Sequence, residues 1–150
     1  PGSLDDILQE IIWVDTPQLQ DWDTERFEVV HQPAVEPHGW MLTHSDGWSM
    51  LHSGDSGPCE ELWTRIGRCS FAVVEMGVPE YVQTKEHHKP SDIEKLATKF
   101  PSTHILLTHT YIDSDYQILT TDIPQFPSNV THGEDGMIFT IDKNGNPTVE

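Results

Sequence analysis

Apolar residues recur along the chain in short runs that turn residues separate. The runs with the length and composition of strands are 27–31, 39–44, 48–52, 71–74, 104–108 and 137–141. Asp46-Gly47 stands between the second and third runs, and an Asp-Gly pair in this position is a strong β-hairpin signal. Asn144-Gly145, after the last run, is a second candidate hairpin turn. The run 71–74 is continuously apolar, as in a strand that is buried on both faces. The pattern therefore predicts a sheet with an antiparallel pair and a fully buried strand.

Other segments have apolar residues at the spacing of amphipathic helices. They are residues 4–13, 59–66 and 91–100. Ser3 is placed to cap the first of them. Pro58 suits the first position of the second helix, and Ser91 with Glu94 forms a capping box for the third. Strands and helices thus alternate after residue 48, which predicts an α/β fold.

The chemistry-bearing stretch of the chain is Gly54-Asp55-Ser56-Gly57, between a predicted strand and a predicted helix. Gly54 and Gly57 permit tight or positive-φ backbone on both sides of the carboxylate. An aspartate in this position is either a cap or turn residue or a metal ligand. On this stretch alone the cap or turn interpretation is favoured, because one carboxylate fixes no metal.

Three further residues with acid–base or metal-binding side chains stand at the ends of predicted elements. Glu75 ends the run 71–74, His109 follows the run 104–108, and His87 precedes the third helix. Open α/β sheets gather ligands and catalytic groups at the carboxyl ends of their strands. Carboxylate oxygen and imidazole nitrogen suit zinc, manganese or iron. Without other information, however, the simpler interpretation of His87-His88 is a pair of polar loop residues.

The remaining histidines give no comparable signal. Four of them lie in or beside strands without a partner at chelating spacing, and we expect structural roles for His31, His38, His44 and His104. His52 is expected to pack against its neighbours. Nothing in the spacing of His132 assigns it a role.

These features follow one order along the chain. They are Gly54-Asp55-Ser56-Gly57-Pro58-Cys59-Glu60, Val73-Val74-Glu75, His87 before Pro90-Ser91-Asp92, Leu106-Leu107-Thr108-His109 and Glu134-Asp135-Gly136-Met137. As a set they resemble the C-terminal half of metallo-β-lactamase-fold hydrolases, in particular the ribonuclease Z and cyclic-nucleotide phosphodiesterase branch. The resemblance covers residues 27–142. It implies half of a metallo-β-lactamase-like αββα sandwich, which is a mixed sheet with flanking helices.

The resemblance also divides the chain and implies a partner. Residues 27–150 would form the half-domain, and residues 1–26 would be an N-terminal helix and linker in which Pro1-Gly2-Ser3 looks like a tag remnant. A complete domain of this family is considerably longer, so one face of the half-sandwich would be bare. We expect a complementary N-terminal half, a homodimer, or the helix 4–13 to cover it.

The same resemblance implies roles for individual residues. Asp55 would bridge two metal ions and His109 would bind one of them, with zinc as the first choice and manganese or iron as others. His87 and Glu75 would assist proton transfer to the leaving group. The implied reaction is metal-assisted hydrolysis of a phosphodiester or nucleotide substrate.

The chain also departs from the family pattern. It lacks the His-x-His-x-Asp-His cluster that supplies most of the metal ligands, Lys89 replaces a hydroxyl residue after His87, and the arginine that follows the last histidine is missing from Thr110-Tyr111-Ile112-Asp113. One zinc ion alone usually takes three protein donors. Two interpretations therefore stand, a catalytic half-domain that another segment completes, and a non-catalytic module kept for interaction or scaffolding.

Composition limits the partners and the cellular compartment that we expect for this chain. The 150 residues carry 8 basic and 25 acidic side chains, a net charge of −17. This excess of acidic residues argues against a surface on this chain that binds nucleic-acid phosphates. A protein adapted to high salt would have the same excess. No apolar run reaches membrane-spanning length and no signal-peptide pattern opens the chain, so we expect a cytoplasmic protein. Cys59 and Cys69 lack the Cys-x-x-Cys spacing and are expected to be reduced thiols.

Overall fold

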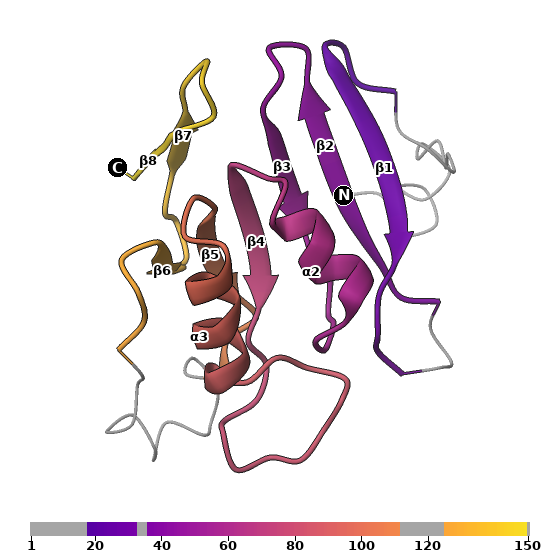
Figure 1. Ribbon diagram of the computed structural model, residues 1–150, viewed down its shortest axis with the longest axis vertical. Helices are drawn as coiled ribbons and strands as arrows, with labels where there is room; N and C mark the ends of the chain where they lie inside the picture. The colour runs from indigo at the N-terminus through magenta and orange to yellow at the C-terminus, as the bar shows by residue number, and fades with distance from the viewer. Residues whose placement is uncertain (1–17, 33–35, 112–124, 150) are drawn as a thin grey trace, which may run out of the picture.

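The fold is built on one mixed sheet. A computed structural model describes residues 18–32, 36–111 and 125–149. The strands of the sheet are β1 (Trp22–Glu28), β2 (His38–His44), β3 (Ser49–His52), β4 (Phe71–Glu75), β5 (His104–Thr108) and β6 (Val130–His132). They lie side by side in their order along the chain, antiparallel from β1 to β3 and parallel from β3 to β6 (Figure 1). The predicted α/β class is confirmed, whereas the predicted helix 4–13 lies outside the described residues.

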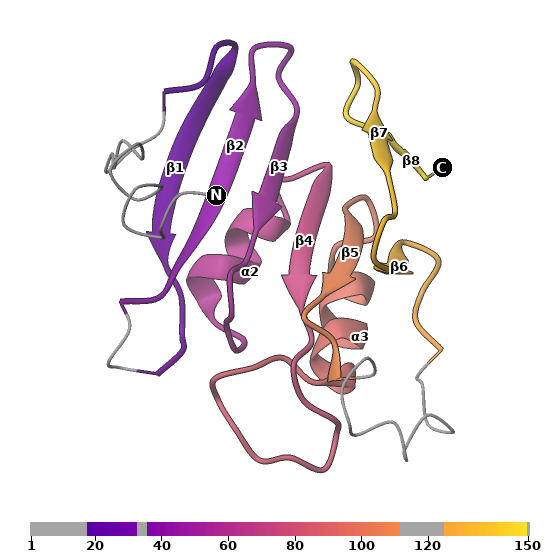
Figure 2. The same cartoon turned by 180° about the vertical axis from the view of Figure 1, so that it is seen from behind.

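Two helices cover one face of this sheet. They are α2 (Glu60–Ile66), between β3 and β4, and α3 (Pro90–Lys99), between β4 and β5. Figure 1 shows both helices in front of the strands, and Figure 2 shows both behind them. Alternate residues of the strands are buried against them, and the fully buried ones include Leu51, Ala72, Val74, Ile105 and Leu107. Each buried Val, Leu or Ile side chain stabilises the fold by about 1.5–3 kcal/mol, so the core holds the helices to the sheet.

The opposite face of the sheet is also apolar. Its side chains alternate with the core residues along the strands and are half-buried, and they include Trp40, Leu42, Met50, Val73 and Leu106. No described helix lies in front of this face in Figure 2. One end of it is covered by the hairpin of β7 (Phe139–Ile141) and β8 (Pro147–Val149), where the Phe139 ring lies 5.4 Å from that of Phe71.

The predicted turns agree with the structure better than the predicted strand ends. Gly47 and Gly145 have φ values of 92° and 84°, and each lies in the tight turn of a hairpin as expected. The predicted strand 27–31 was misplaced, because β1 begins at Trp22 and pairs along its whole length with β2. Trp22 packs edge-on against Trp48, with ring centroids 5.0 Å apart, and this contact between segments extends the strand beyond its apolar run.

The two helix starts also differ from expectation. Cys59 is the N-cap of α2, so Pro58 lies before the helix and not at its first position. Ser91 lies inside α3, and the predicted capping box with Glu94 is wrong. Instead the carboxylate of Glu80 accepts hydrogen bonds from the Ser91 amide at 2.9 Å and from its hydroxyl at 2.8 Å. A carboxylate from the preceding loop thus satisfies the start of this helix.

None of the helices in the described part of the chain is long and apolar enough to cross a membrane. Both cysteines are free thiols. Cys69 is buried, and this burial raises the pKa of its thiol to about 12.

Candidate functional site

The predicted site residues meet at one edge of the sheet. β3, β4 and β5 are parallel, so their carboxyl ends point to the same edge (Figure 1). Glu75 is the last residue of β4, Asp55 follows β3, and His109 follows β5 directly. His87 reaches this edge from the loop between β4 and α3.

Close contacts between backbone segments fix the loop that carries Asp55. A Cβ atom on Gly57 would lie 1.8 Å from the carbonyl oxygen of Lys85, so only glycine fits there. The Gly57 amide donates a hydrogen bond of 2.8 Å to the Val30 carbonyl. Gly54 has a φ of 63°, a value that glycine adopts without strain. The loop is therefore held between two distant parts of the chain.

Asp55 does not cap the helix that follows. The N-cap of α2 is Cys59, and no side chain makes a capping hydrogen bond there. The carboxylate of Asp55 instead lies opposite His109, with 4.0 Å between Oδ1 and Nδ1 and about half of each side chain exposed (50% and 55%). Two ligands at tetrahedral angles around one zinc ion are about 3.4 Å apart, given metal–ligand bonds of about 2.1 Å. The separation is thus close to that of two ligands of one metal ion.

Glu75 and His87 form a second pair beside the first. Glu75 is fully buried, and its Oε2 accepts a hydrogen bond from the Gly77 amide at 2.6 Å. The same oxygen lies 3.3 Å from Nδ1 of His87. The His87 ring stacks on that of His109, with centroids 5.9 Å apart, so the two pairs are in contact.

The backbone of Gly77 forms part of the wall of the site. A Cβ atom on Gly77 would lie 2.9 Å from Oε2 of Glu75, 2.9 Å from Nδ1 of His87 and 3.1 Å from Cδ2 of His109. Any side chain here would push these groups apart, so the absence of one allows their close approach.

Sequence reasoning missed His31, for which a structural role was expected. Its ring packs edge-on against that of His87, with centroids 5.0 Å apart. The antiparallel bridge between Val30 and Gly57 brings it there. A signal for it existed, because His31 follows the apolar pair Val29-Val30 as His109 follows its strand.

His52 was expected to pack, but its side chain is exposed. Its Nδ1 accepts a hydrogen bond of 3.0 Å from the Gly54 amide. The ring is still partly desolvated by its surroundings, which lowers the pKa of His52 and outweighs the nearby Asp55 carboxylate, which raises it. By contrast His44 stacks on Trp48 and His104 stacks on Phe71, as expected of residues that serve packing.

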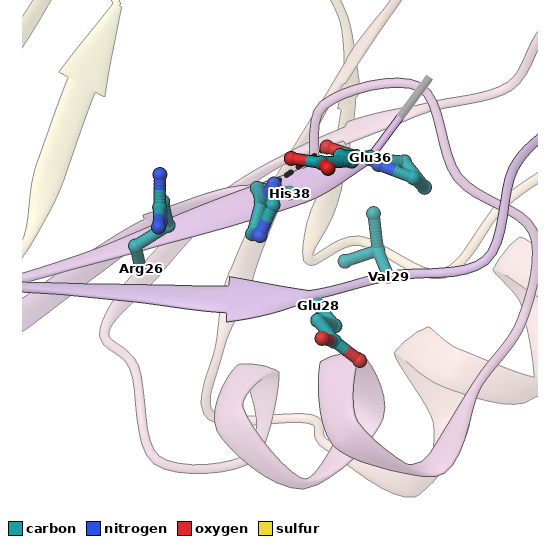
Figure 3. Close-up of a pocket in the computed structure, with 6 residues that line it drawn as sticks. Arg26, Glu28, Val29, Glu36 and His38 are labelled. Atoms are coloured by element: carbon teal, nitrogen blue, oxygen red, sulfur yellow. Dashed lines mark hydrogen bonds between the residues drawn. The ribbon is translucent and has the colours of Figure 1, made fainter. Parts of the chain in front are cut away.

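Of the cavities in the described part of the chain, one touches this cluster and a larger one lies apart from it. One of about 190 Å³ opens beside His109 and is lined by the ends of β4 and β5 together with the segment 133–139. Another of about 460 Å³ lies at the carboxyl end of β1 (Figure 3). Its lining mixes Arg26 with Glu28 and Glu36, and the Nδ1–H of His38 donates a 2.6 Å hydrogen bond to the Glu36 carbonyl. None of the predicted site residues lines the larger cavity.

The donor set fits a metal ion only in part. Asp55 and His109 offer an oxygen and a nitrogen, the donor types that zinc, manganese and iron accept. Within residues 18–32, 36–111 and 125–149, however, no group of three or more His, Cys, Asp or Glu side chains is arranged to hold a metal. Further ligands would have to come from elsewhere.

Comparison with known proteins gives relatives in sequence and in structure. No family model matches the chain. Zinc phosphodiesterase ELAC protein 2 from Homo sapiens is 29% identical over 97 residues, which are 61% of this chain and 12% of that protein. The protein from Mus musculus has the same identity and coverage. The chain therefore spans only about an eighth of the length of these curated relatives.

The structural relatives share the fold. The metallo-β-lactamase fold protein YhfI from Bacillus subtilis has a TM-score of 0.62 at 14% identity, over 81% of this chain and 51% of that one. The long form RNase Z from yeast has a TM-score of 0.57 at 15% identity, over 82% of this chain and 18% of that one. The expected fold, that of part of a metallo-β-lactamase-fold protein, is confirmed, as is the resemblance to the ribonuclease Z branch.

Proposed function

We propose that this chain is one half of a metal-dependent phosphodiester hydrolase of the ribonuclease Z or cyclic-nucleotide phosphodiesterase type. The observation that carries the proposal is the convergence of Asp55, His109, His87 and Glu75 at one edge of the sheet. The chain is also similar in sequence to part of a zinc phosphodiesterase. Other enzymes use this fold, so the argument for the reaction rests on the site and not on the fold.

In this proposal Asp55 and His109 hold the metal ion, with zinc as the first choice and manganese or iron as alternatives. When bound, the metal would act as a Lewis acid that stabilises negative charge on the phosphoryl oxygens. The stacking of His87 on His109 supports this proposal, because the proposed proton-transfer residue lies beside a proposed metal ligand. The two pairs would thus act on one phosphate group.

His87 is the proposed general acid for the leaving oxygen. Its Nδ1–H faces Oε2 of Glu75 at 3.3 Å, which leaves Nε2 for proton exchange with the substrate. Glu75 is buried and held by backbone amides, so it orients the imidazole and need not touch the substrate. Removal of Glu75 would then reduce activity through His87.

The missing ligands point to a complementary half. Two protein donors fall short of the three that one catalytic zinc usually takes. The apolar face with Trp40, Leu42 and Met50, which no described helix covers, is where a second sheet would pack. We propose that a complementary N-terminal segment, or a second copy of the chain, supplies both the cover and the ligands. Two free thiols suit the reducing cytoplasm as the compartment.

The test measures metal binding and hydrolysis together. The chain is titrated with zinc and with manganese by calorimetry, alone and after co-expression with a segment that carries a His-x-His-x-Asp-His cluster. Hydrolysis of a chromogenic phosphodiester is followed in the same samples. We expect tight binding and turnover only in the assembled protein, and the Asp55→Ala/His109→Ala variant should abolish both. An assembly that is inactive, or one that the double substitution leaves unchanged, would contradict the proposal.

A non-catalytic interaction module is the second candidate. It is favoured by the lack, among the described residues, of a three-donor metal site. This candidate predicts a stable complex through the apolar sheet face, without tight metal binding. The calorimetric experiment therefore separates the two functions.

A further inference from the structure

His88 is a fully buried polar residue next to the site, and its contacts differ from those of its neighbour His87. It has no solvent-exposed surface. Its Nδ1 lies 2.6 Å from the carbonyl oxygen of Ser56, and its Nε2 lies 3.2 Å from Nε1 of Trp63. Its backbone amide donates a hydrogen bond of 2.7 Å to Oε1 of Glu75. One residue thus connects the loop after β3, the helix α2 and the end of β4.

These partners determine which ring nitrogen carries the hydrogen. The Ser56 carbonyl can only accept, so Nδ1 must donate. The Trp63 indole N–H can only donate, so Nε2 must accept. Both ring nitrogens of His88 are therefore occupied in the Nδ1–H tautomer, and neither is left for a metal or a substrate.

The position of His88 relates it to both site pairs. Ser56 follows Asp55 directly, so the hydrogen bond to its carbonyl holds the loop that presents the Asp55 carboxylate. The His88 amide holds Oε1 of Glu75, while Oε2 of the same carboxylate faces His87. Nδ1 of the imidazole also lies 3.5 Å from Oε1 of Glu75, so both the ring and the amide of His88 contact this carboxylate.

We propose that His88 is a positioning residue that couples the Asp55 loop to the Glu75–His87 pair. This inference rests on the proposed function, because it assigns His88 a part in arranging that site. A buried histidine that served stability alone would affect the whole core when replaced. The coupling role instead predicts that only the site residues lose their positions, and that this loss depends on which ring nitrogen of His88 is removed.

Two substitutions at this position separate the ring nitrogens. The amide group of Asn lies close to the place of Nδ1, so His88→Asn keeps a donor for the Ser56 carbonyl. The amide of Gln reaches the place of Nε2, so His88→Gln keeps a partner for Trp63 and loses the link to Ser56. Trp63→Phe is the matched control, because it removes the indole donor and leaves the Ser56 link intact.

The first readout is amide hydrogen exchange in the 150-residue chain, which needs no metal. Gly57 and Gly77 report on the two ends of the coupling, because their amides donate to Val30 and to Glu75, and the Ile105 amide reports on the core. We expect His88→Gln to reduce protection at Gly57 and Gly77 by at least about 10-fold relative to Ile105. His88→Asn and Trp63→Phe should change this ratio by less than about threefold.

The second readout is zinc affinity of the assembled protein, measured by calorimetry for the same variants. Loss of an outer-shell partner typically weakens metal binding 10–100-fold, and we expect a loss in that range for His88→Gln but not for His88→Asn. Equal loss of protection at all three amides, or equal effects of Asn and Gln, would overturn the proposal. If the exchange pattern is as expected but the unsubstituted assembly binds no zinc, the coupling stands and the proposed metal function fails.

Discussion

The imidazole rings of His87 and His109 stack with centroids 5.9 Å apart and planes inclined by 20°. The two residues arrive from different parts of the fold, one from the loop before α3 and the other from the end of β5. Their contact joins the carboxylate–imidazole pair of Glu75 and His87 to the pair of Asp55 and His109. In the proposed function, a single phosphate group would therefore contact both.

The first prediction separates proton transfer from metal binding. In the assembled enzyme, His87→Gln should lower kcat by about 10²–10⁴-fold, the range that a general acid contributes, and should leave zinc affinity nearly unchanged. His44→Gln is the control, since His44 pairs with Trp22 and stacks on Trp48 at the opposite end of β2. Steady-state kinetics and calorimetry check both values. Unchanged kcat in His87→Gln would remove this residue from the mechanism.

The second prediction concerns the buried carboxylate. In Glu75→Gln, one of the two carboxylate oxygens that accept the Gly77 and His88 amides becomes an NH₂ group that cannot accept. One backbone donor is then left unsatisfied, which costs about 1–3 kcal/mol of unfolding free energy. Glu94→Gln, on an exposed position of α3, should stay within about 0.5 kcal/mol of the unsubstituted chain. Urea unfolding measures both, and equal stability of the two variants would contradict the role of Glu75.

Much of the fold follows from local sequence patterns. The hairpin between β2 and β3, the buried strand β4 and the helix α3 each carry their signal within a few residues, as an Asp-Gly turn, an apolar run or a helical stripe. Strand ends were less predictable. β1 extends to Trp22 because of packing on Trp48, and β6 has only three residues with no apolar run.

The sequence predicted the main site residues but not the residues that hold them in place. Asp55, Glu75 and His109 stand at strand ends, where position along the chain indicates position in space. The contacts of His31 and His88 depend on segments far away in the sequence, so no local spacing indicates them. The same holds for Glu80, which caps α3 from 11 residues away.

The third prediction distinguishes a steric clash from backbone strain. Gly57→Ala places a methyl group where the Lys85 carbonyl oxygen lies, so the loop and the segment at Lys85 must separate. We expect a loss of more than about 3 kcal/mol and an increased tendency to aggregate. Gly47→Ala is the control, because its Cβ would meet nothing within 4 Å although its φ is 92°. That strain should cost only about 1–2 kcal/mol. Similar unfolding midpoints for the two variants would refute the close contact.

The fourth prediction is a pH dependence. Burial lowers the pKa of His104, whose ring packs against those of Phe71 and Phe139, below the value of 6.5 that is usual for histidine. The unfolded chain then binds more protons than the folded one as the pH falls through 6.5, so stability is complete above this pH and decreases below it. His104→Gln should make the unfolding free energy less dependent on pH between about pH 8 and pH 5.

Urea titrations at a series of pH values provide the measurement for His104→Gln. Part of the dependence should remain, because the pKa of His52 is lowered as well and contributes with the same sign. A curve for the variant that runs parallel to that of the unsubstituted chain would show that His104 has no part in the dependence.

In the six-stranded sheet, each strand lies beside the one that precedes it in the chain. A chain that leaves the ribosome from its N-terminus can therefore add strands one at a time, and none has to wait for a later strand to be inserted between two neighbours. Each step then closes only the connection between two adjacent strands, the longest of which joins β4 to β5 and contains α3. Such a sheet can assemble during synthesis and present a formed face to whatever covers it afterwards.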